Sequence, residues 1–397
     1  MAGKHAGSRS SRRSEGTDVD PDAAADRRRS RVRAVAGLLA LVVVAVGIVA
    51  LTAVWDDPVG SPDPGGAAST GVAADPSESP DPSPSGPPPC PSTDDLDSPV
   101  AVQVDPAIAP TLRALVRASG CTGIALSPRP SAEVAAAALA DETLPDVWVP
   151  ESTLWVVRAR PAGDAASRTP DGTGTAIAPE VVADSLAISP VVVATSTRAA
   201  RTDATWRELI ADPGLKLGAP LTSTAALAPL LGARVEADDD GLRPAQQPDE
   251  LAPLARRAGA RTGPPASDGA RLLAAARSSG VAAVAEQTVL ASGLNPATDL
   301  ELSVPEVGTL VLDYPAVATA TGERRDAAFA VAAWLGRTTA TDAGTEALNE
   351  VGFRGPDGLP LEQGVTGVRA LRLRDLGVLS QTLTAWNEAL QAVGAAG

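Results

Sequence analysis

Residues 145–155 read PDVWVPESTLW and join a strand to a helix. Apolar side chains gather from Leu144 to Val149, which predicts a short strand over 144–149. A second apolar run follows Ser152 and predicts a short helix over 152–158, because Ser is favoured just before a helix begins. A strand that leads directly into a helix is the repeating unit of an α/β fold.

The same alternation continues on both sides of this segment. Towards the N-terminus, strands are predicted over 98–105 and 122–126, and helices over 106–119 and 131–140. Towards the C-terminus, strands are predicted over 185–195, 215–219, 281–285, 300–305 and 309–319, and helices over 205–209, 222–231, 249–259, 267–278, 323–337, 341–351 and 375–393. We therefore expect crossover connections and a mainly parallel sheet. The last helix carries a wide apolar face and is expected to dock on the core.

Composition excludes several classes of function. The chain has 397 residues, of which 44% are hydrophobic and only 2% aromatic, so its core must consist largely of Ala, Val and Leu. Its net charge of −15 argues against nucleic acid as a partner. The single histidine, His5, lies in the basic N-terminal tail, so the rest of the chain has no Ser-His-Asp or Cys-His catalysis and no His-ligated zinc. We expect no cofactor and no metal.

Ala34 to Val54 form a run of 21 residues without a charge. In a helix they would span about 31 Å, which matches a bilayer core of about 30 Å. Five arginines lie in residues 27–33 and an aromatic and two acidic residues follow the run, which predicts a single membrane-spanning helix with its N-terminus in the cytoplasm. A cleaved signal peptide is the alternative, but its apolar region is normally about 7–15 residues long. No cysteine follows closely, which disfavours a lipoprotein anchor.

The remainder of the chain divides at changes in composition. Residues 1–33 are expected to form a basic, disordered cytoplasmic tail, and residues 55–93 an extracellular tether. Ten prolines among residues 56–89 favour an extended chain that cannot build a core. Residues 94–397 form the ordered domain. The two cysteines of the chain, Cys90 at the end of the tether and Cys121 in the ordered domain, lie on the oxidising side of the membrane and are expected to form a disulfide.

Five segments in order carry a resemblance to a known family: PDVWVPESTLW (145–155), SPVVVAT (189–195), TWRELIADPGLKLGAP (205–220), LDYP (312–315) and GFR (352–354). With this order and spacing, residues 97–395 resemble the extracellular solute-binding protein family. They are most similar to the substrate-binding domains of high-GC Gram-positive bacteria, some of which are fused to von Willebrand type A domains. No such domain follows within this sequence.

The resemblance implies a two-lobed type II periplasmic-binding-protein fold. One lobe would comprise residues 97–187 and 311–397, and the other residues 188–310. The segments SPVVVAT and TLVLDYP would cross between the lobes, and a solute would be captured by closure of the cleft. The implied partners are a small-molecule solute and either an ABC transporter permease or a sensor.

Two strand-to-helix junctions supply candidate ligand-binding residues: Glu151, Ser152 and Thr153 at the first, and Thr222, Ser223 and Thr224 at the second. Free backbone N–H groups at a helix start can hold an anion, although Glu151 would oppose one. Hydroxyl donors at the second junction suit an oxyanion or a polar solute. Simple helix capping is the alternative at both junctions.

Four further candidates end strands or precede prolines: Ser189, Glu286, Gln287 and Tyr314. Ser189 and Tyr314 lie in the implied crossing segments, and a packing role for Tyr314 is the alternative. Phe353 and Arg354 are expected to be structural.

Other motifs are weaker. Trp148 and Trp155 could stack on a sugar, but burial is favoured for Trp148 within its strand. The acidic stretch 236–241 partly matches a calcium loop, and we expect a solvated loop instead because its twelfth position is Gln247 rather than Glu. The expected function is non-enzymatic capture of a solute. The alternatives are an interaction module of the cell envelope, and a hydrolase that uses carboxylates such as Asp313 and Glu286.

Overall fold

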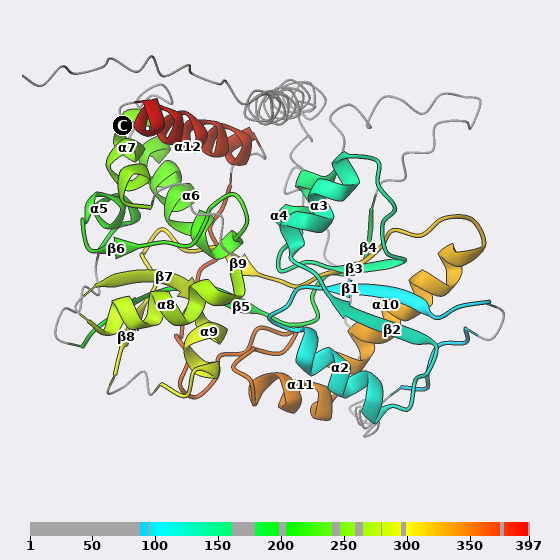
Figure 1. Cartoon of the computed structure of the whole chain (residues 1–397). Helices are drawn as coiled ribbons and strands as arrows, with labels where there is room; N and C mark the ends of the chain where they lie inside the picture. Colours follow the sequence, from blue (N-terminus) through cyan, green and yellow to red (C-terminus); the bar gives the residue numbers. More distant parts are fainter. Residues whose placement is uncertain are drawn as a thin grey trace, which may run out of the picture.

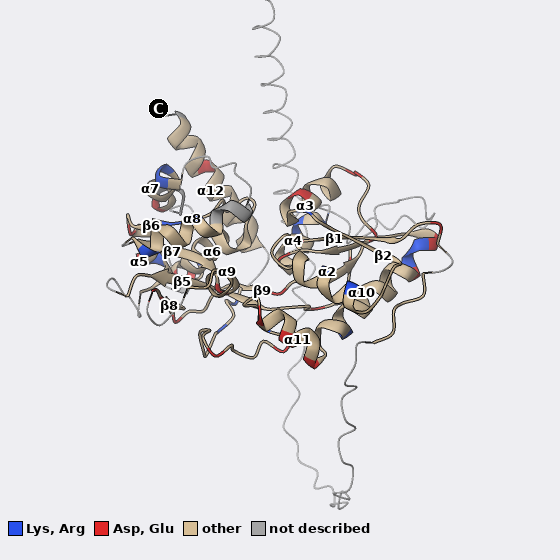
Figure 2. Cartoon of the chain, turned by 60° about the horizontal axis from the view of Figure 1, so that its bottom comes forward, with Lys and Arg blue, Asp and Glu red and all other residues tan. Residues whose placement is uncertain are grey.

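The computed structural model describes residues 88–93, 96–160, 179–197, 204–239, 247–258, 265–278, 280–294, 299–373 and 377–395. The expected membrane helix Ala34–Val54 and the expected tail lie outside the described residues, as does most of the tether. None of the described helices is both long and apolar enough to span a bilayer. The described chain forms two α/β lobes that lie side by side (Figure 1 and Figure 2).

The first lobe is built on a five-stranded sheet of order β2-β1-β3-β10-β4. Its strands are β1 (Val100–Val104), β2 (Ile124–Pro128), β3 (Val147–Val149), β4 (Glu180–Ala183) and β10 (Ala316–Ala318). Its helices are α2 (Ala109–Ala118), α3 (Ser131–Leu139), α4 (Thr153–Ala159), α10 (Arg325–Thr339) and α11 (Asp342–Asn349), with the short 3₁₀ helix η2 (Gly322–Arg324) before α10. Helices α3 and α4 cover one face of the sheet, and α2, α10 and α11 lie on the other (Figure 1).

The second lobe is built on a sheet of order β6-β7-β5-β8, with β9 also paired to β5. Its strands are β5 (Ser189–Thr195), β6 (Leu215–Lys216), β7 (Val281–Ala285), β8 (Glu301–Ser303) and β9 (Val311–Leu312). Its helices are α5 (Trp206–Ala211), α6 (Thr224–Asp239), α7 (Gln247–Ala258), α8 (Pro265–Arg277), α9 (Glu286–Ala291) and α12 (Gly377–Ala395). Helices α8 and α9 lie on one side of the sheet, and the other four lie opposite (Figure 1).

Strand residues alternate between two cores, as a period of two requires. In β3, Val147 and Val149 face the large core shared with α2 and α10, whereas Trp148 packs in a separate cluster with α3 and α4. In β5, Val192 and Ala194 face α8, and their neighbours Val191 and Val193 face the opposite side. Both central strands are therefore covered on both faces, which explains their continuous apolar sequences.

The prediction of a mainly parallel sheet is wrong, because antiparallel pairs outnumber parallel pairs among the described strands. Strands β1, β2 and β3 are parallel, but β10 runs antiparallel to its neighbours β3 and β4. In the second sheet β5 runs antiparallel to β7, β8 and β9. In each sheet the reversed strand arrives directly from the other lobe, β5 after residues 184–188 and β10 after residues 313–315. Such a strand enters without a helical crossover, so the rule that makes βαβ strands parallel does not apply to it.

The C-terminal helix differs from the expected assignment of residues 311–397 to the first lobe. The apolar face of α12, with Leu379, Leu383 and Trp386 buried, packs mainly against α7 and also against α6 in the second lobe. The chain reaches this position through a third crossing, residues 350–373, which pairs with Ile188 and Thr309 on the way. The docked core face expected for this helix is confirmed, but on the other lobe.

The prediction of an acidic loop over 236–241 is wrong for residues 236–239, because α6 continues to Asp239. The Glu236 carboxylate accepts hydrogen bonds from the backbone N–H groups of Trp206 and Arg207, both at 2.8 Å, and so caps the start of α5. Asp238 pairs with Arg234 at 2.8 Å. These partners let the acidic residues remain helical. Among the described residues no group of three His, Cys, Asp or Glu side chains could hold a metal.

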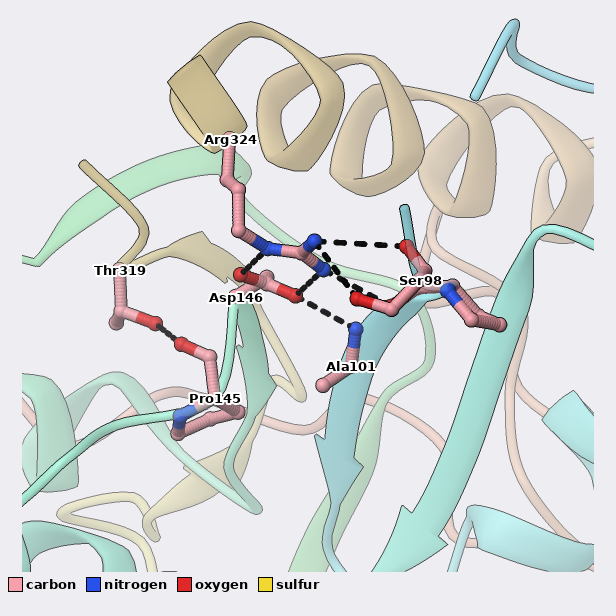
Figure 3. Close-up of polar contacts among 7 residues, drawn as sticks. Ser98, Ala101, Pro145, Asp146, Thr319 and Arg324 are labelled. Atoms are coloured by element: carbon pink, nitrogen blue, oxygen red, sulfur yellow. Dashed lines mark hydrogen bonds and ion pairs between the residues drawn. The ribbon is translucent and has the colours of Figure 1, made fainter. Parts of the chain in front are cut away.

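A disulfide and an ion pair connect segments of the first lobe that are far apart in sequence. The predicted disulfide between Cys90 and Cys121 is present. The Asp146 carboxylate before β3 binds Arg324 through a two-pronged contact, at 2.8 Å to Nε and 2.6 Å to Nη2, and accepts from the Ala101 backbone N–H at 2.7 Å (Figure 3). Burial alone would raise the pKa of Asp146, but the hydrogen bonds from Arg324 and Ala101 lower it below its ordinary value. Arg324 also donates to Ser98 and thereby ties η2 to the start of β1 (Figure 3).

Candidate functional site

A cavity of about 530 Å³ lies between the two lobes. The polar residues in its wall come from both sides: Asp105, Ser131 and Glu151 from the first lobe, and Thr222, Ser223, Gln287, Thr288 and Ser292 from the second. Leu272, Leu273, Val284 and Leu312 supply apolar wall, and Tyr314 lies on a crossing segment. A volume of this size is typical of sites for small molecules.

The topology explains why these residues meet. Asp105 follows β1 and Glu151 follows β3, and the two strands are parallel. Gln287 lies in the first turn of α9 after β7, and Thr222 and Ser223 precede α6, the helix that follows β6. Strands β6 and β7 are also parallel. The carboxyl ends of parallel strands from both lobes therefore border the same cavity, which is where α/β folds bind ligands.

A larger hollow of about 780 Å³ lies along the edge strand β8 and residues 362–369. It lies against the second lobe and the third crossing and receives nothing from the first sheet. A hinge motion of the lobes would not enclose a ligand there. We therefore place the candidate site in the smaller cavity between the lobes.

Glu151 links the two lobes across the cavity. Its Oε1 atom accepts hydrogen bonds from the Trp155 indole N–H at 3.0 Å and from the Thr224 backbone N–H at 2.6 Å. Trp155 belongs to the first lobe, whereas Thr224 is the first residue of α6 in the second. Burial, followed by the negative charge of Asp105, raises the pKa of Glu151 to about 7, although the hydrogen bonds from Thr224 and Trp155 lower it.

Asp105 is the second carboxylate in the wall. One of its oxygens accepts from the Ala107 backbone N–H at 3.0 Å, and the other accepts from the Ser131 hydroxyl at 2.8 Å. Ser131 Oγ in turn accepts from the Glu151 backbone N–H at 2.9 Å, so Ser131 joins the two carboxylate-bearing loops. Burial raises the pKa of Asp105, against the hydrogen bonds from Ala107 and Ser131.

Sequence reasoning did not select Asp105 or Ser131. The signal was present, because Asp105 ends the first predicted strand in the same way that Glu151 follows the third. Attention to polar residues after every predicted parallel strand, rather than to hydroxyl clusters, would have found Asp105. Ser131 begins α3, so its position resembles a helix cap and gives no separate sequence signal.

Five of the predicted site residues line the cavity: Glu151, Thr222, Ser223, Gln287 and Tyr314. Tyr314 is only 1% exposed and adopts a positive φ of 41°, and its ring meets Phe353 edge-on with the centroids 5.2 Å apart. Burial, and then the charges of Asp105, Glu151 and Asp313, raise the pKa of its phenol well above the ordinary value. Tyr314 therefore packs against Phe353 and also lines the cavity.

Ser152, Thr153 and Thr224 do not line the cavity. Ser152 caps α4 by accepting from the Leu154 backbone N–H at 3.3 Å. Thr153 donates to the Asp313 carboxylate from its backbone N–H at 2.8 Å and also from its hydroxyl. The Thr224 side chain is buried and its backbone N–H is bound to Glu151. At these three positions the capping or packing alternative describes the structure.

Ser189 and Glu286 are also outside the cavity wall. Ser189 is fully buried and its Oγ accepts from the Gln287 backbone N–H at 3.0 Å. Glu286 is fully buried and forms a two-pronged ion pair with Arg354, at 2.8 and 2.9 Å, and also accepts from the Val365 backbone N–H at 2.7 Å. This pair attaches the third crossing to α9. The structural role expected for Arg354 is consistent with this contact.

The carboxylates considered for hydrolysis and the two tryptophans considered for sugar stacking lie outside the cavity wall. Asp313 binds Thr153, and Glu286 binds Arg354. Trp148 and Trp155 are both 1% exposed within the core of the first lobe. The burial expected for Trp148 is confirmed, and neither ring can stack on a solute in this cavity.

Two α/β lobes joined by chain crossings, with a polar cavity between them, define the class of two-lobed binding proteins. The chain belongs to the bacterial extracellular solute-binding protein family, whose family model matches residues 100–354. That range contains both sheets and the two crossings beside β4 and β9. The resemblance inferred from the sequence is thereby confirmed.

The fold is shared with a solved structure. A periplasmic thiamin-binding protein superposes with a TM-score of 0.53 at 15% identity, covering 77% of this chain and 99% of that one. The sulfate-binding protein SubI from Mycobacterium tuberculosis H37Rv has a TM-score of 0.46 at 18% identity, with 66% and 88% of the two chains covered. The fructose-6-phosphate-bound protein AfuA from Actinobacillus pleuropneumoniae has a TM-score of 0.49 at 12% identity, with 75% and 98% covered. No curated protein matches the chain.

Proposed function

We propose that this chain is a membrane-anchored extracellular solute-binding protein of type II topology, which captures a small solute by closing its lobes and presents it to an ABC importer or a sensor. The observation that carries the proposal is the cavity of about 530 Å³, whose polar wall comes from both lobes. Closure would bring the Thr222, Ser223 and Gln287 donors of the second lobe onto a solute held by the first.

The crossings supply the hinge for this motion. Residues 184–188 and 313–315 join the lobes side by side, because the Leu186 backbone N–H donates to the Tyr314 carbonyl at 3.0 Å. Beyond them β5 pairs with β9, in the register Ser189 to Leu312. Short, paired connections allow the lobes to rotate while their cores stay intact. Tyr314 lies on one of these connections, so solute contact and hinge geometry meet at one residue.

The anchoring part of the proposal rests on the apolar run Ala34–Val54 and the Pro-rich tether that follows it. The disulfide supports an oxidising compartment, because Cys90 at the end of the tether is joined to Cys121 in the first lobe. Membrane fractionation of the full chain with a tag at each end tests this topology. We expect membrane association, a protected N-terminal tag and a C-terminal tag that an external protease removes.

A thermal-shift and calorimetric screen of the full chain in detergent tests solute capture, with amino acids, sugars, amines, oxyanions and metal salts as ligands. A ligand at about 100 times its dissociation constant adds about 2.7 kcal/mol, which should raise Tm by several degrees. The double variant Thr222→Ala and Ser223→Ala should weaken the binding of any solute found. Thr197→Ala, at an exposed turn position two residues after β5, is the matched control.

Absence of any shift in a folded sample free of co-purified solute would contradict solute capture. It would favour the interaction module of the cell envelope, for which pull-down of a membrane or wall protein is the direct assay.

A further inference from the structure

We propose that the solute is an organic cation, held in the cavity between the lobes by the carboxylates of Asp105 and Glu151. This inference rests on the proposed function and names the chemical class of solute for the same site.

The wall carries negative charge without a compensating base. Asp105 and Glu151 are its acidic residues, and no Lys, Arg or His is present among the described residues that line the cavity. Arg158 is the basic residue of α4, and it does not line the cavity. Its guanidinium lies over the Trp155 ring, with Cζ 4.4 Å from the ring centroid. Two carboxylates beside one low-dielectric cavity repel each other, and a cation placed between them removes that repulsion.

Both carboxylates keep acceptor capacity. The two oxygens of Asp105 accept from the Ala107 backbone N–H and from Ser131. Glu151 Oε1 accepts from the Trp155 indole N–H and from the Thr224 backbone N–H. A carboxylate oxygen can accept two hydrogen bonds, so an ammonium or guanidinium group could still be bound by both side chains.

Tyr314 adds a polar group to the same wall. The residue is 1% exposed and lines the cavity, and its ring packs edge-on against Phe353. A phenol hydroxyl can both donate and accept hydrogen bonds, so it can bind a polar group of a solute beside the two carboxylates.

The same geometry argues against the oxyanion considered for Thr222–Thr224. The start of α6 would attract an anion, but the Glu151 carboxylate already accepts from the Thr224 backbone N–H at 2.6 Å. An anionic solute would have to displace this carboxylate and then face Asp105. The start of α6 is therefore already bound by a carboxylate of the protein itself, Glu151.

The apolar wall favours an organic cation over a metal ion. Leu272, Leu273, Val284 and Leu312 offer no ligand atoms in their side chains but suit a hydrocarbon body. Among the described residues no cluster of three metal-binding side chains exists. An amine, guanidinium or quaternary ammonium compound with a small apolar body fits both the charge and the walls.

The test is a binding comparison on the full chain in detergent by calorimetry and thermal shift. The cationic probes are choline, agmatine and putrescine, and dimethylbutanol is the uncharged carbon isostere of choline. Sulfate, phosphate and acetate represent anions, and magnesium and calcium chlorides represent metals. We expect at least one organic cation to raise Tm by several degrees, and for choline we expect at least about tenfold tighter binding than for dimethylbutanol.

Two isosteric variants connect that binding to the carboxylates. Asp105→Asn and Glu151→Gln can keep the hydrogen bonds to Ala107, Ser131 and Thr224 but lose the charge. Each should weaken cation binding by about tenfold or more while leaving the fold intact by circular dichroism. Glu350→Gln, at an exposed position after α11, should leave affinity unchanged.

The pH dependence adds a signature that a structural role would not produce. A bound cation favours ionised Glu151, whose pKa is raised to about 7 in the empty site. The other acidic groups near Glu151 and Tyr314 are Asp105 and Asp313. The basic residue of α4 is Arg158, which lies over the Trp155 ring. Affinity should therefore rise between about pH 6 and about pH 8 in wild type, with proton release, and stay flat in Glu151→Gln.

The outcomes separate the two proposals. Binding of an anion or a metal without binding of any organic cation would overturn the cationic class and leave the solute-binding function standing. Cation binding unaffected by both isosteric variants would overturn the assignment to Asp105 and Glu151. Failure of every class of probe to bind would count against the proposed function itself.

Discussion

The carboxylate of Glu151 in the first lobe accepts a hydrogen bond of 2.6 Å from the backbone N–H of Thr224 in the second. This bond connects the loop after β3 to the start of α6 across the cavity. A side chain that touches both lobes can report whether they are closed. It also places a carboxyl group with a raised pKa at the position where the lobes meet.

The stability of the solute-free chain should depend on Glu151. Because its pKa is raised from 4.5 to about 7, the folded state binds a proton more tightly than the unfolded state. Stability should fall as pH rises from about 4.5 to about 7 and then level off, by on the order of 3 kcal/mol from this group. Urea unfolding at several pH values measures the slope. Glu151→Gln should flatten it, and an unchanged slope in that variant would contradict the raised pKa.

Asp146→Asn should destabilise the first lobe, because it breaks a two-pronged pair with Arg324 whose carboxylate is 11% exposed (Figure 3). We expect a loss of about 1–3 kcal/mol at neutral pH. In wild type the pKa of Asp146 is lowered, so this contribution is present above the unfolded value of 3.8 and disappears as pH falls through the lower folded value.

The matched control for Asp146→Asn is Glu180→Gln. Glu180 pairs with Arg325 at 3.4 Å, but both side chains are more than half exposed. Exposed pairs contribute little, so this change should cost about 0–1 kcal/mol. Equal losses in the two variants, measured by urea unfolding, would show that burial of the Asp146 pair has no effect.

Glu286→Gln should be more damaging, because it leaves Arg354, whose side chain is 5% exposed, without its charge partner. Breaking a buried pair from one side typically costs about 3–5 kcal/mol. The double change Glu286→Gln with Arg354→Met removes both charges and should recover part of that loss. A double variant no more stable than Glu286→Gln would indicate that the Arg354 contacts to backbone carbonyls dominate instead.

Loss of the disulfide should destabilise the first lobe without affecting the solute site. Cys90 and Cys121 are 31 residues apart in sequence, which corresponds to about 3–4 kcal/mol in the chain-entropy model. The pair of changes Cys90→Ala and Cys121→Ala should lower Tm by several degrees. Reductant should reproduce the loss in wild type and have no effect on the variant; a reductant effect on both would point to another cause.

Part of the candidate site follows from local sequence. Among the polar residues just after a predicted strand, Glu151, Thr222, Ser223 and Gln287 line the cavity. The same pattern also selected Ser152 and Thr153, which cap α4 and bind Asp313. Successive residues of a helix are rotated by about 100° around its axis, so adjacent residues at a helix start face different surroundings. Sequence spacing does not say which of them faces a cavity.

The sequence by itself determined the alternation of strands and helices, the disulfide pairing and the family, because these depend on local periodicity, on a single pair of cysteines and on the order of short motifs. Only the tertiary structure decided the direction of β5 and β10, the position of α12 on the second lobe and the meeting of Asp105 with Glu151. Each of these depends on which apolar surface remains to be covered, or on contacts between residues far apart in sequence. Such contacts have no local period, so no pattern along the chain records them.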